Sequence, residues 1–423
     1  MNSFVLKGDV VFCPTNKRMI AIEDAYIVVR CGICELVYGK LPDDAKDLPL
    51  HDYTGKLVMP GMVDLHIHAP QYAYRGLGAD MELLDWLEHY AFKEEAKYAD
   101  LDYADKAYAI FADALHSSAT TRAVVFGTIH RKSTKLLMDK LEESGIVSYV
   151  GKVNMDRNSP DSLTESTEDS CRRTERFITE TSDKYRNTYP IITPRFVPSC
   201  TDELLEKLGW LSEQYDVPVQ SHLSENPGEI KWVRELCPDS RFYGEVYDRA
   251  GLFGNNANTV MAHCVWSGDE EIALMKERGV YIAHCPASNM NVSSGIAPIR
   301  RYLSEELRVG LGSDIAGGQS ISIFTAMVEA MQVSRLYWRH IDNTKKPLNF
   351  TEVFHMATKG GGQFFGKAGS FDRGYEFDAI VIDDSTLPHP QELTLLQRAE
   401  RAVWLGGDKT GLIAKYVRGT KII

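Results

Sequence analysis

The sequence predicts an α/β protein: a (β/α)8, TIM-like barrel with a small β-sandwich domain built from both chain ends. Three observations lead to this prediction. Short alternating apolar runs fill residues 1–60, apolar runs alternate with helical patterns through residues 61–369, and strand-like runs return in residues 370–423. The middle stretch contains enough β/α units to close a barrel. We therefore expect a barrel domain over 61–369 and a composite β domain over 1–60 and 370–423.

The chain ends have β-sheet texture. Residues 4–6, 19–22 and 26–29 are apolar runs bounded by polar and turn residues. Near the other end, residues 378–382 and 402–405 are also apolar runs, and we expect both to be strands. Cys31 and Cys34 have CxxC spacing, but no second pair accompanies them, so we interpret this segment as strand and turn.

Eight apolar runs in the middle stretch are candidate barrel strands. They are residues 62–68, 123–128, 147–155, 191–198, 217–223, 259–264, 279–285 and 308–314. Helical patterns separate most of them, for example at residues 202–215 and 269–278. An open doubly wound sheet is the alternative, but it usually carries a glycine-rich phosphate loop after its first strand. Gly76-Leu77-Gly78 is too short for such a loop, which favours the closed barrel.

Composition narrows the function classes. The formal net charge is -12, which argues against a nucleic-acid partner and against long-range attraction of an anionic substrate. Lys7 and Asp9 interrupt any signal-peptide core, and no apolar run approaches the length of a membrane span. The eight cysteines are scattered along the chain. We expect a cytoplasmic protein with no membrane partner.

Histidine and aspartate residues stand at the ends of the candidate strands. His66 and His68 end the first strand, and because side chains two residues apart share a strand face, both imidazoles point to one spot. His222, His263 and Asp314 end the fifth, sixth and eighth strands. In a parallel barrel these ends meet at one rim, and such a donor set suits zinc or iron(II). An open position for water would make the site catalytic.

Two further residues near strand ends could have either a functional or a structural role. Glu225 lies three residues after His222, which suits a proton shuttle that reaches a metal-bound water, although it could also be a helix-start glutamate before Asn226-Pro227. His284 lies near the end of the seventh strand. We expect a structural role for His284, because the metal does not need a fifth imidazole.

Several longer fragments resemble a known family. They are His68-Ala69-Pro70-Gln71-Tyr72, Pro194-Arg195-Phe196, His222-Leu223-Ser224-Glu225-Asn226, Leu84-Asp85-Trp86-Leu87 and His284-Cys285-Pro286-Ala287-Ser288-Asn289. With the metal-ligand pattern, they resemble the amidohydrolase superfamily and, within it, the guanine deaminases. The likeness covers most of the chain, and the fragments around Gln71 and Arg195 are its most specific part.

The resemblance implies roles for individual residues. It implies that His66, His68, His222 and Asp314 hold one zinc ion, with iron(II) as the alternative, and that His263 lies beside the bound water. Glu225, Asp314 and His263 would be catalytic. Gln71, Arg195, Phe196 and His263 would contact a purine. The expected reaction is guanine plus water to xanthine plus ammonia, in purine catabolism, and a homodimer is usual among such proteins.

Arg195 gives a physical reason to expect guanine. A guanidinium only donates hydrogen bonds, so it suits the O6 acceptor of guanine and meets the N6 donor of adenine badly. Some related barrels bridge two metals with a modified lysine on strand four; here that strand carries Arg195, and Lys152 lies on strand three, which favours one metal.

Two other functions remain open from the sequence. A sister hydrolase acting on another aminated ring, of triazine or cytosine type, would share the metal ligands. A non-catalytic barrel scaffold should lack one or more ligands, whereas all are present here.

One apolar set has the spacing of a helix face: Leu83, Trp86, Leu87 and Tyr90. We expect these side chains first of all to be packed in the core, and as the second possibility to form a wall of the pocket.

Overall fold

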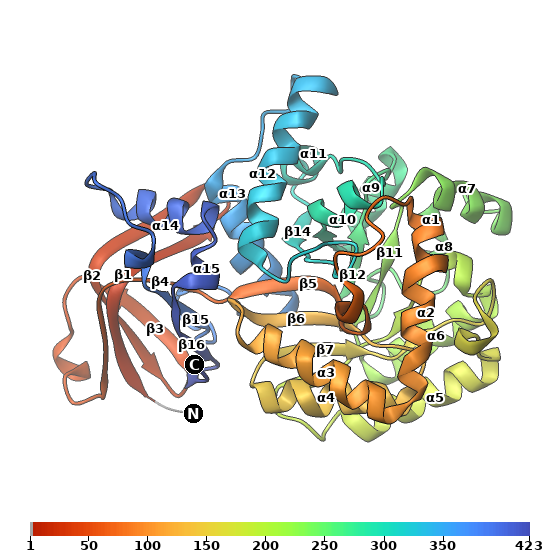
Figure 1. The fold of residues 1–423 in the computed structure, drawn as a ribbon, viewed down its shortest axis with the longest axis horizontal. Coiled ribbons are helices and arrows are strands. Elements are labelled where there is room, and N and C mark those ends of the chain that lie inside the picture. The colour runs from red at the N-terminus through yellow and green to blue at the C-terminus, as the bar shows by residue number, and fades with distance from the viewer. Residues whose placement is uncertain (1–2) are drawn as a thin grey trace.

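The computed structural model describes residues 3–423 and has two parts. Figure 1 shows a barrel surrounded by helices on one side and a smaller sheet on the other, with both chain termini at the sheet. The strands of the smaller sheet lie within residues 4–60 and 379–421, which supports the proposed division into residues 1–60 with 370–423 and residues 61–369.

Barrel strands occur near all eight predicted runs, and the third run is broken in two. The fourth run is partly wrong: of residues 191–198 only 193–194 form a strand, a short strand at 188–190 precedes the predicted range, and residues 197–199 form a 3-10 helix. The barrel strands are β5 (Met62–His68), β6 (Thr120–Phe126), β7 (Val147–Gly151), β8 (Val153–Asn154), β9 (Thr188–Pro190), β10 (Thr193–Pro194), β11 (Val219–Leu223), β12 (Thr259–His263), β13 (Tyr281–His284) and β14 (Arg308–Leu311). All pairings among them are parallel.

The barrel closes through two junctions. Strands β5, β6, β7 and β9 form one sheet and β11 to β14 another. A parallel bridge between Ile192 and Val219 joins them on one side. On the other side the backbone N–H of Asp314 donates to the carbonyl of His66 at 2.9 Å. The predicted (β/α)8 barrel is confirmed, and its closure brings the ends of the first and eighth strands together.

Helices connect and surround the strands. They are α1 (Leu83–Trp86), α2 (Phe92–Ala96), α3 (Leu101–His116), α4 (Arg131–Ser144), α5 (Thr167–Thr181), α6 (Asp202–Tyr215), α7 (Pro227–Leu236), α8 (Tyr243–Arg249), α9 (Asp269–Arg278), α10 (Pro286–Asn291), α11 (Ile299–Ser304), α12 (Ile323–His340) and α13 (Phe350–His355). The helices α6 and α9 occupy the two ranges predicted for them. The α6 helix begins where Thr201 accepts a hydrogen bond from the Leu204 backbone, and α9 ends at Gly279, which has a φ of 66°.

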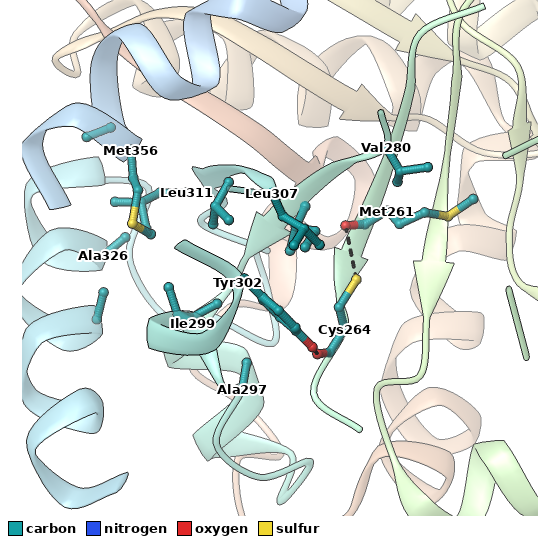
Figure 2. Packing of buried hydrophobic residues seen from close by; sticks show 14 of the residues in the cluster. Met261, Cys264, Val280, Ala297, Ile299, Tyr302, Leu307, Leu311, Ala326 and Met356 are labelled. Atoms are coloured by element: carbon teal, nitrogen blue, oxygen red, sulfur yellow. Dashed lines mark hydrogen bonds between the residues drawn. The ribbon is translucent and has the colours of Figure 1, made fainter. Parts of the chain in front are cut away.

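Apolar side chains alternate between the two faces of the barrel strands. Ala283 and Tyr281 of β13 belong to the interior cluster, whereas Ile282 packs outward. Figure 2 shows part of the outer layer, where Tyr302 of α11 extends toward Cys264 just after β12. The hydroxyl of Tyr302 donates to the carbonyl of Cys264 at 2.5 Å. A helix of the outer layer therefore fixes the carboxyl end of β12, the strand that ends at His263.

The smaller part is one continuous sheet rather than two facing sheets. Its strands, in spatial order, are β17 (Thr420–Lys421), β16 (Leu412–Val417), β15 (Ala379–Ile382), β4 (Leu50–Pro60), β1 (Phe4–Thr15), β2 (Arg18–Arg30) and β3 (Ile33–Tyr38). The sheet still encloses a core, because Phe4 of β1 and Tyr416 of β16 belong to the same buried cluster as Phe371 and Phe377. The backbone of Phe377 also bonds to Gly32, beside β3.

One predicted strand near the carboxyl end is wrong. Residues 402–405 were expected to be extended, but they lie at the end of α14 (Leu395–Trp404), which is followed by α15 (Gly407–Thr410). Thr394 and Gln397 form a reciprocal capping box at the start of α14. The prediction around Cys31 holds, because Gly32 lies in the turn between β2 and β3.

Across residues 3–423, none of the helices combines the length and the apolar composition that crossing a bilayer requires.

Candidate active site

The histidines and the aspartate singled out from the sequence converge at one rim of the barrel. Nε2 of His66 is 3.1 Å from Oδ1 of Asp314, and Nε2 of His68 is 3.6 Å from the same oxygen. Nε2 of His68 is 3.2 Å from Nε2 of His222. His263 joins the group, with its Nε2 3.7 Å from Oδ2 of Asp314. The structure thus brings together all five residues from four separate strand ends.

Hydrogen bonds on the outer side of two imidazoles set which ring nitrogen faces the centre. Nδ1 of His222 donates to the carbonyl of Arg195 at 2.6 Å, so its Nε2 lone pair faces His68. Nδ1 of His263 contacts Oδ1 of Asn289 at 2.9 Å. Burial lowers the pKa of His68 and His222 well below the usual value, which favours neutral rings.

This donor set fits a divalent metal ion. Ligand atoms of His66, His68 and Asp314 lie within 4.8 Å of one another, as do those of His66, His222 and His263. Nε2 of His66 is buried and has no hydrogen-bond partner among the described residues. Buried polar atoms are normally paired, so imidazole nitrogens that converge on a carboxylate in this way fit a site for a divalent cation.

The backbone is strained at two residues of the cluster. Asp314 has a φ of 45° and His263 a φ of 73°, values that non-glycine residues seldom adopt. Asp64 of β5 is fully buried and accepts hydrogen bonds from the backbone N–H groups of His66 and Ser313, both at 3.1 Å. Asp64 therefore fixes the strand ends that carry His66 and Asp314, a role that the sequence analysis missed.

Glu225 faces the cluster of histidines and Asp314 rather than capping a helix. Its Oε2 is 3.4 Å from Nε2 of His263, and its Oε1 accepts from the Ser294 hydroxyl at 3.0 Å. The following helix, α7, is instead capped by Asn226 and Glu229. Burial, reinforced by the negative charge of Asp314, raises the pKa of Glu225 to about 8.

A cavity opens onto the cluster. Gln71, Arg195 and Phe196 all line it, as the sequence analysis expected of substrate contacts. Leu83, Trp86 and Leu87 line it too, although they are also buried in an apolar cluster, so this helical stripe both packs and walls the pocket.

Glu95 lies behind the pocket residues and was not found from the sequence. It belongs to α2, and its carboxylate accepts hydrogen bonds from Gln71 and from Arg195. The run Glu94-Glu95 in a charged segment resembles an ordinary solvated helix face. Only the fold reveals that Glu95 is almost fully buried.

Two other residues considered from the sequence stand apart from the cluster. His284 lies on the outer face of β13, beside Ile299 and Ala330 in a separate small cavity. Lys152 is buried between β7 and β8, where it pairs with Glu165. Among residues 3–423, His284 is in none of the groups of His, Cys, Asp and Glu side chains that could hold a metal ion.

Comparison with known proteins identifies close relatives over nearly the whole chain. Residues 57–410 match the amidohydrolase family. The guanine deaminase of Dictyostelium discoideum is 39% identical over 379 residues, which cover 88% of this chain and 83% of that protein. The guanine deaminase of Mus musculus is 40% identical over 395 residues, which cover 90% of this chain and 85% of that protein.

A solved structure is also similar. The guanine deaminase from C. acetobutylicum, crystallised with guanine bound in its active site, superimposes with a TM-score of 0.97. It shares 48% sequence identity, and the match covers 100% of both chains.

Proposed function

Because the chain belongs to the amidohydrolase family, we propose that it is a guanine deaminase, which hydrolyses guanine to xanthine and ammonia. The observation that carries this proposal is the likeness, at 48% identity over the full length, to an enzyme crystallised with guanine in its active site. The pocket adds chemical support, because a metal-type cluster, a buried carboxylate and a buried arginine all face it.

We propose zinc as the metal, one ion per chain, held by His66, His68, His222 and Asp314. Three neutral imidazoles and one carboxylate suit zinc, although iron(II) accepts the same donors. When bound, the metal lowers the pKa of a coordinated water and so supplies the nucleophile. The lack of a hydrogen-bond partner for Nε2 of His66 among the described residues supports this set.

Glu225 and His263 handle the protons in this proposal. Glu225 takes a proton from the attacking water and delivers it to N3 of the purine, which makes C2 more electrophilic. His263 and Asp314 orient the attacking oxygen, and His263 stabilises the charge that develops on it. The second proton comes from the hydroxyl that has been added to C2 and goes to the exocyclic amine; the bond from C2 to the amine nitrogen then breaks, ammonia leaves, and the C2 carbonyl of xanthine forms. The 3.4 Å separation of Glu225 and His263 supports a shared proton path.

Arg195, Gln71 and Phe196 recognise the ring in this proposal. Arg195 donates to O6, Gln71 offers both a donor and an acceptor to the ring edge, and Phe196 provides an apolar face. A site built to donate to O6 leaves a buried donor unpaired when adenine binds. Such a mismatch can discriminate by roughly 10⁴-fold or more.

A substrate panel tests the proposed function. Purified protein is assayed with guanine, adenine, cytosine and an aminotriazine, and ammonia release is measured for each. We expect guanine to have by far the highest kcat/KM. Hydrolysis of another ring without guanine turnover would replace the proposal with the sister-enzyme alternative.

A further inference from the structure

We propose that Glu95 is a positioning residue that sets the pocket's preference for the substrate by holding Gln71 and Arg195 in fixed orientations. The inference rests on the proposed function, because it deepens the account of how guanine is recognised. Glu95 lies on α2, Gln71 on the turn after β5, and Arg195 directly after β10. One carboxylate therefore joins three elements that are far apart in the sequence.

The two oxygens of Glu95 have different partners. Oε1 accepts from Nε2 of Gln71 at 3.0 Å, and Oε2 accepts from Nη1 of Arg195. Glu95 and Arg195 are 1% and 2% exposed, so this ion pair is shielded from water. Hydrogen bonds to charged groups in such surroundings are the stronger kind.

The contact with Glu95 fixes which end of the Gln71 amide is the donor. Oε1 of Gln71 accepts from the backbone N–H of Ala316 at 3.0 Å, while Nε2 donates to Glu95. Turning the amide over would set an NH₂ group against the Ala316 N–H and an oxygen against the carboxylate. Both contacts would be repulsive, so the amide keeps one orientation. Its remaining N–H and lone pair are the groups left for a ligand.

Glu95 also neutralises a buried cation at the edge of the metal cluster. Arg195 lines the same cavity as His68, and its positive charge is one of the influences that lower the pKa of that imidazole. The guanidinium carbon also lies 5.0 Å from the centre of the Phe92 ring. Without Glu95, Arg195 would remain charged and buried with its main partner removed, and would reorient.

Replacing Glu95 with glutamine tests the proposal. The variant E95Q keeps the shape but converts one acceptor into a donor, which must then face an N–H of Gln71 or of Arg195. We expect kcat/KM for guanine to fall by about 10- to 100-fold, mainly through a higher KM, because hydrogen bonds to charged groups are lost. With 2-aminopurine, which lacks O6, the fall should be smaller.

The neighbouring Glu94 provides a matched control. It lies on the same helix and is also buried, but its carboxylate binds Lys97 and Tyr103 away from the pocket. The variant E94Q should therefore keep the wild-type KM. The variant E95D keeps the charge but is one methylene shorter, so it should raise KM less than E95Q. Melting temperature and metal content are measured for all three variants.

Three outcomes would overturn this inference. One is an unchanged KM in E95Q. Another is an equal rise of KM in E94Q. The third is loss of folding in both Glu95 variants while E94Q folds, which would make Glu95 a structural residue. A wild-type protein that does not hydrolyse guanine would instead refute the proposed function, so the two failures are distinguishable.

Discussion

At the scale of single residues, the proposed metal ligands and the proposed proton carrier have different partners. Glu225 contacts Ser294 and His263, whereas the proposed ligands contact one another. Replacing Glu225 with glutamine should therefore leave metal content near one ion per chain. Turnover should fall by about 10²- to 10⁴-fold, the usual contribution of a positioned acid or base.

The measurement is kcat with guanine, together with elemental analysis of the same preparation. Glu271→Gln is a suitable control, because Glu271 is equally buried and bonds to Ser224 and Gly244 outside the pocket. Wild-type turnover in the Glu225 variant would refute its role as proton carrier.

The residues of the proposed metal site could be found from the sequence, whereas the residues that hold the site in position could not. Strand-end spacing identifies His66, His68, His222, His263 and Asp314 because the barrel maps strand ends onto one rim. Asp64 and Glu95 act across chain separations of 249 and 100 residues, to Ser313 and Arg195. A local sequence pattern does not show which distant residues will be hydrogen-bond partners, and it does not show whether a glutamate will be buried or exposed.

At the scale of elements, the outer helices hold the strand ends in place. Tyr302 of α11 donates to the carbonyl of Cys264, directly after His263, and Cys264 has a φ of 49°. The substitution Tyr302→Phe leaves that buried carbonyl without this donor. We expect a loss of about 1–3 kcal/mol in the free energy of unfolding.

Thermal melting monitored by circular dichroism checks this prediction. Tyr215→Phe removes a hydroxyl that bonds to Glu175 near the surface, and it should change stability by less than about 0.5 kcal/mol. Equal melting temperatures for the two variants would contradict the anchoring role of α11.

Element type was predictable where length and periodicity agreed. The ranges of α6 and α9 were predicted correctly because each has a sequence signal at one end: Thr201 caps the start of α6, and Gly279 ends α9. The apolar run at residues 402–405 predicts a strand wrongly, because a short apolar run fits either a strand or a helix. The decisive signal lay upstream, where Thr394 and Gln397 have capping-box spacing.

At the scale of the whole molecule, buried charges fasten the sheet to the barrel. Arg122 of β6 donates to Asp378 and Glu376, beside β15, at 2.5 and 2.6 Å. Lys415 of β16 donates to the carbonyls of Leu115, His116, Ser118 and Thr120. Two of these carbonyls end α3, where a cation is favoured.

Removing the amino group of Lys415 should destabilise this junction between the sheet and the barrel. In Lys415→Met the side chain keeps its length, but the carbonyls lose their donor, so we expect at least about 2 kcal/mol of destabilisation. Lys421→Met, on the exposed β17 of the same sheet, should melt like the wild type. A wild-type melting temperature for the Lys415 variant would exclude the junction as a source of stability.

The sequence predicted that both chain ends join in one β domain, because both ends contain short strand-like apolar runs. That the strands form one sheet bent around its own core could not be predicted, because strand order depends on contacts between residues hundreds of positions apart. The cluster that joins Phe4 to Phe371, Phe377 and Tyr416 is an example.

The central claim is that His66, His68, His222 and Asp314 bind one divalent ion beside a guanine pocket. A crystal structure of the purified protein with guanine, recorded at the zinc absorption edge, measures this most directly. We predict one anomalous peak bonded to these four side chains, with guanine O6 directed at Arg195. An ion bound elsewhere, or these four side chains turned away from one another with no ion between them, would contradict the account.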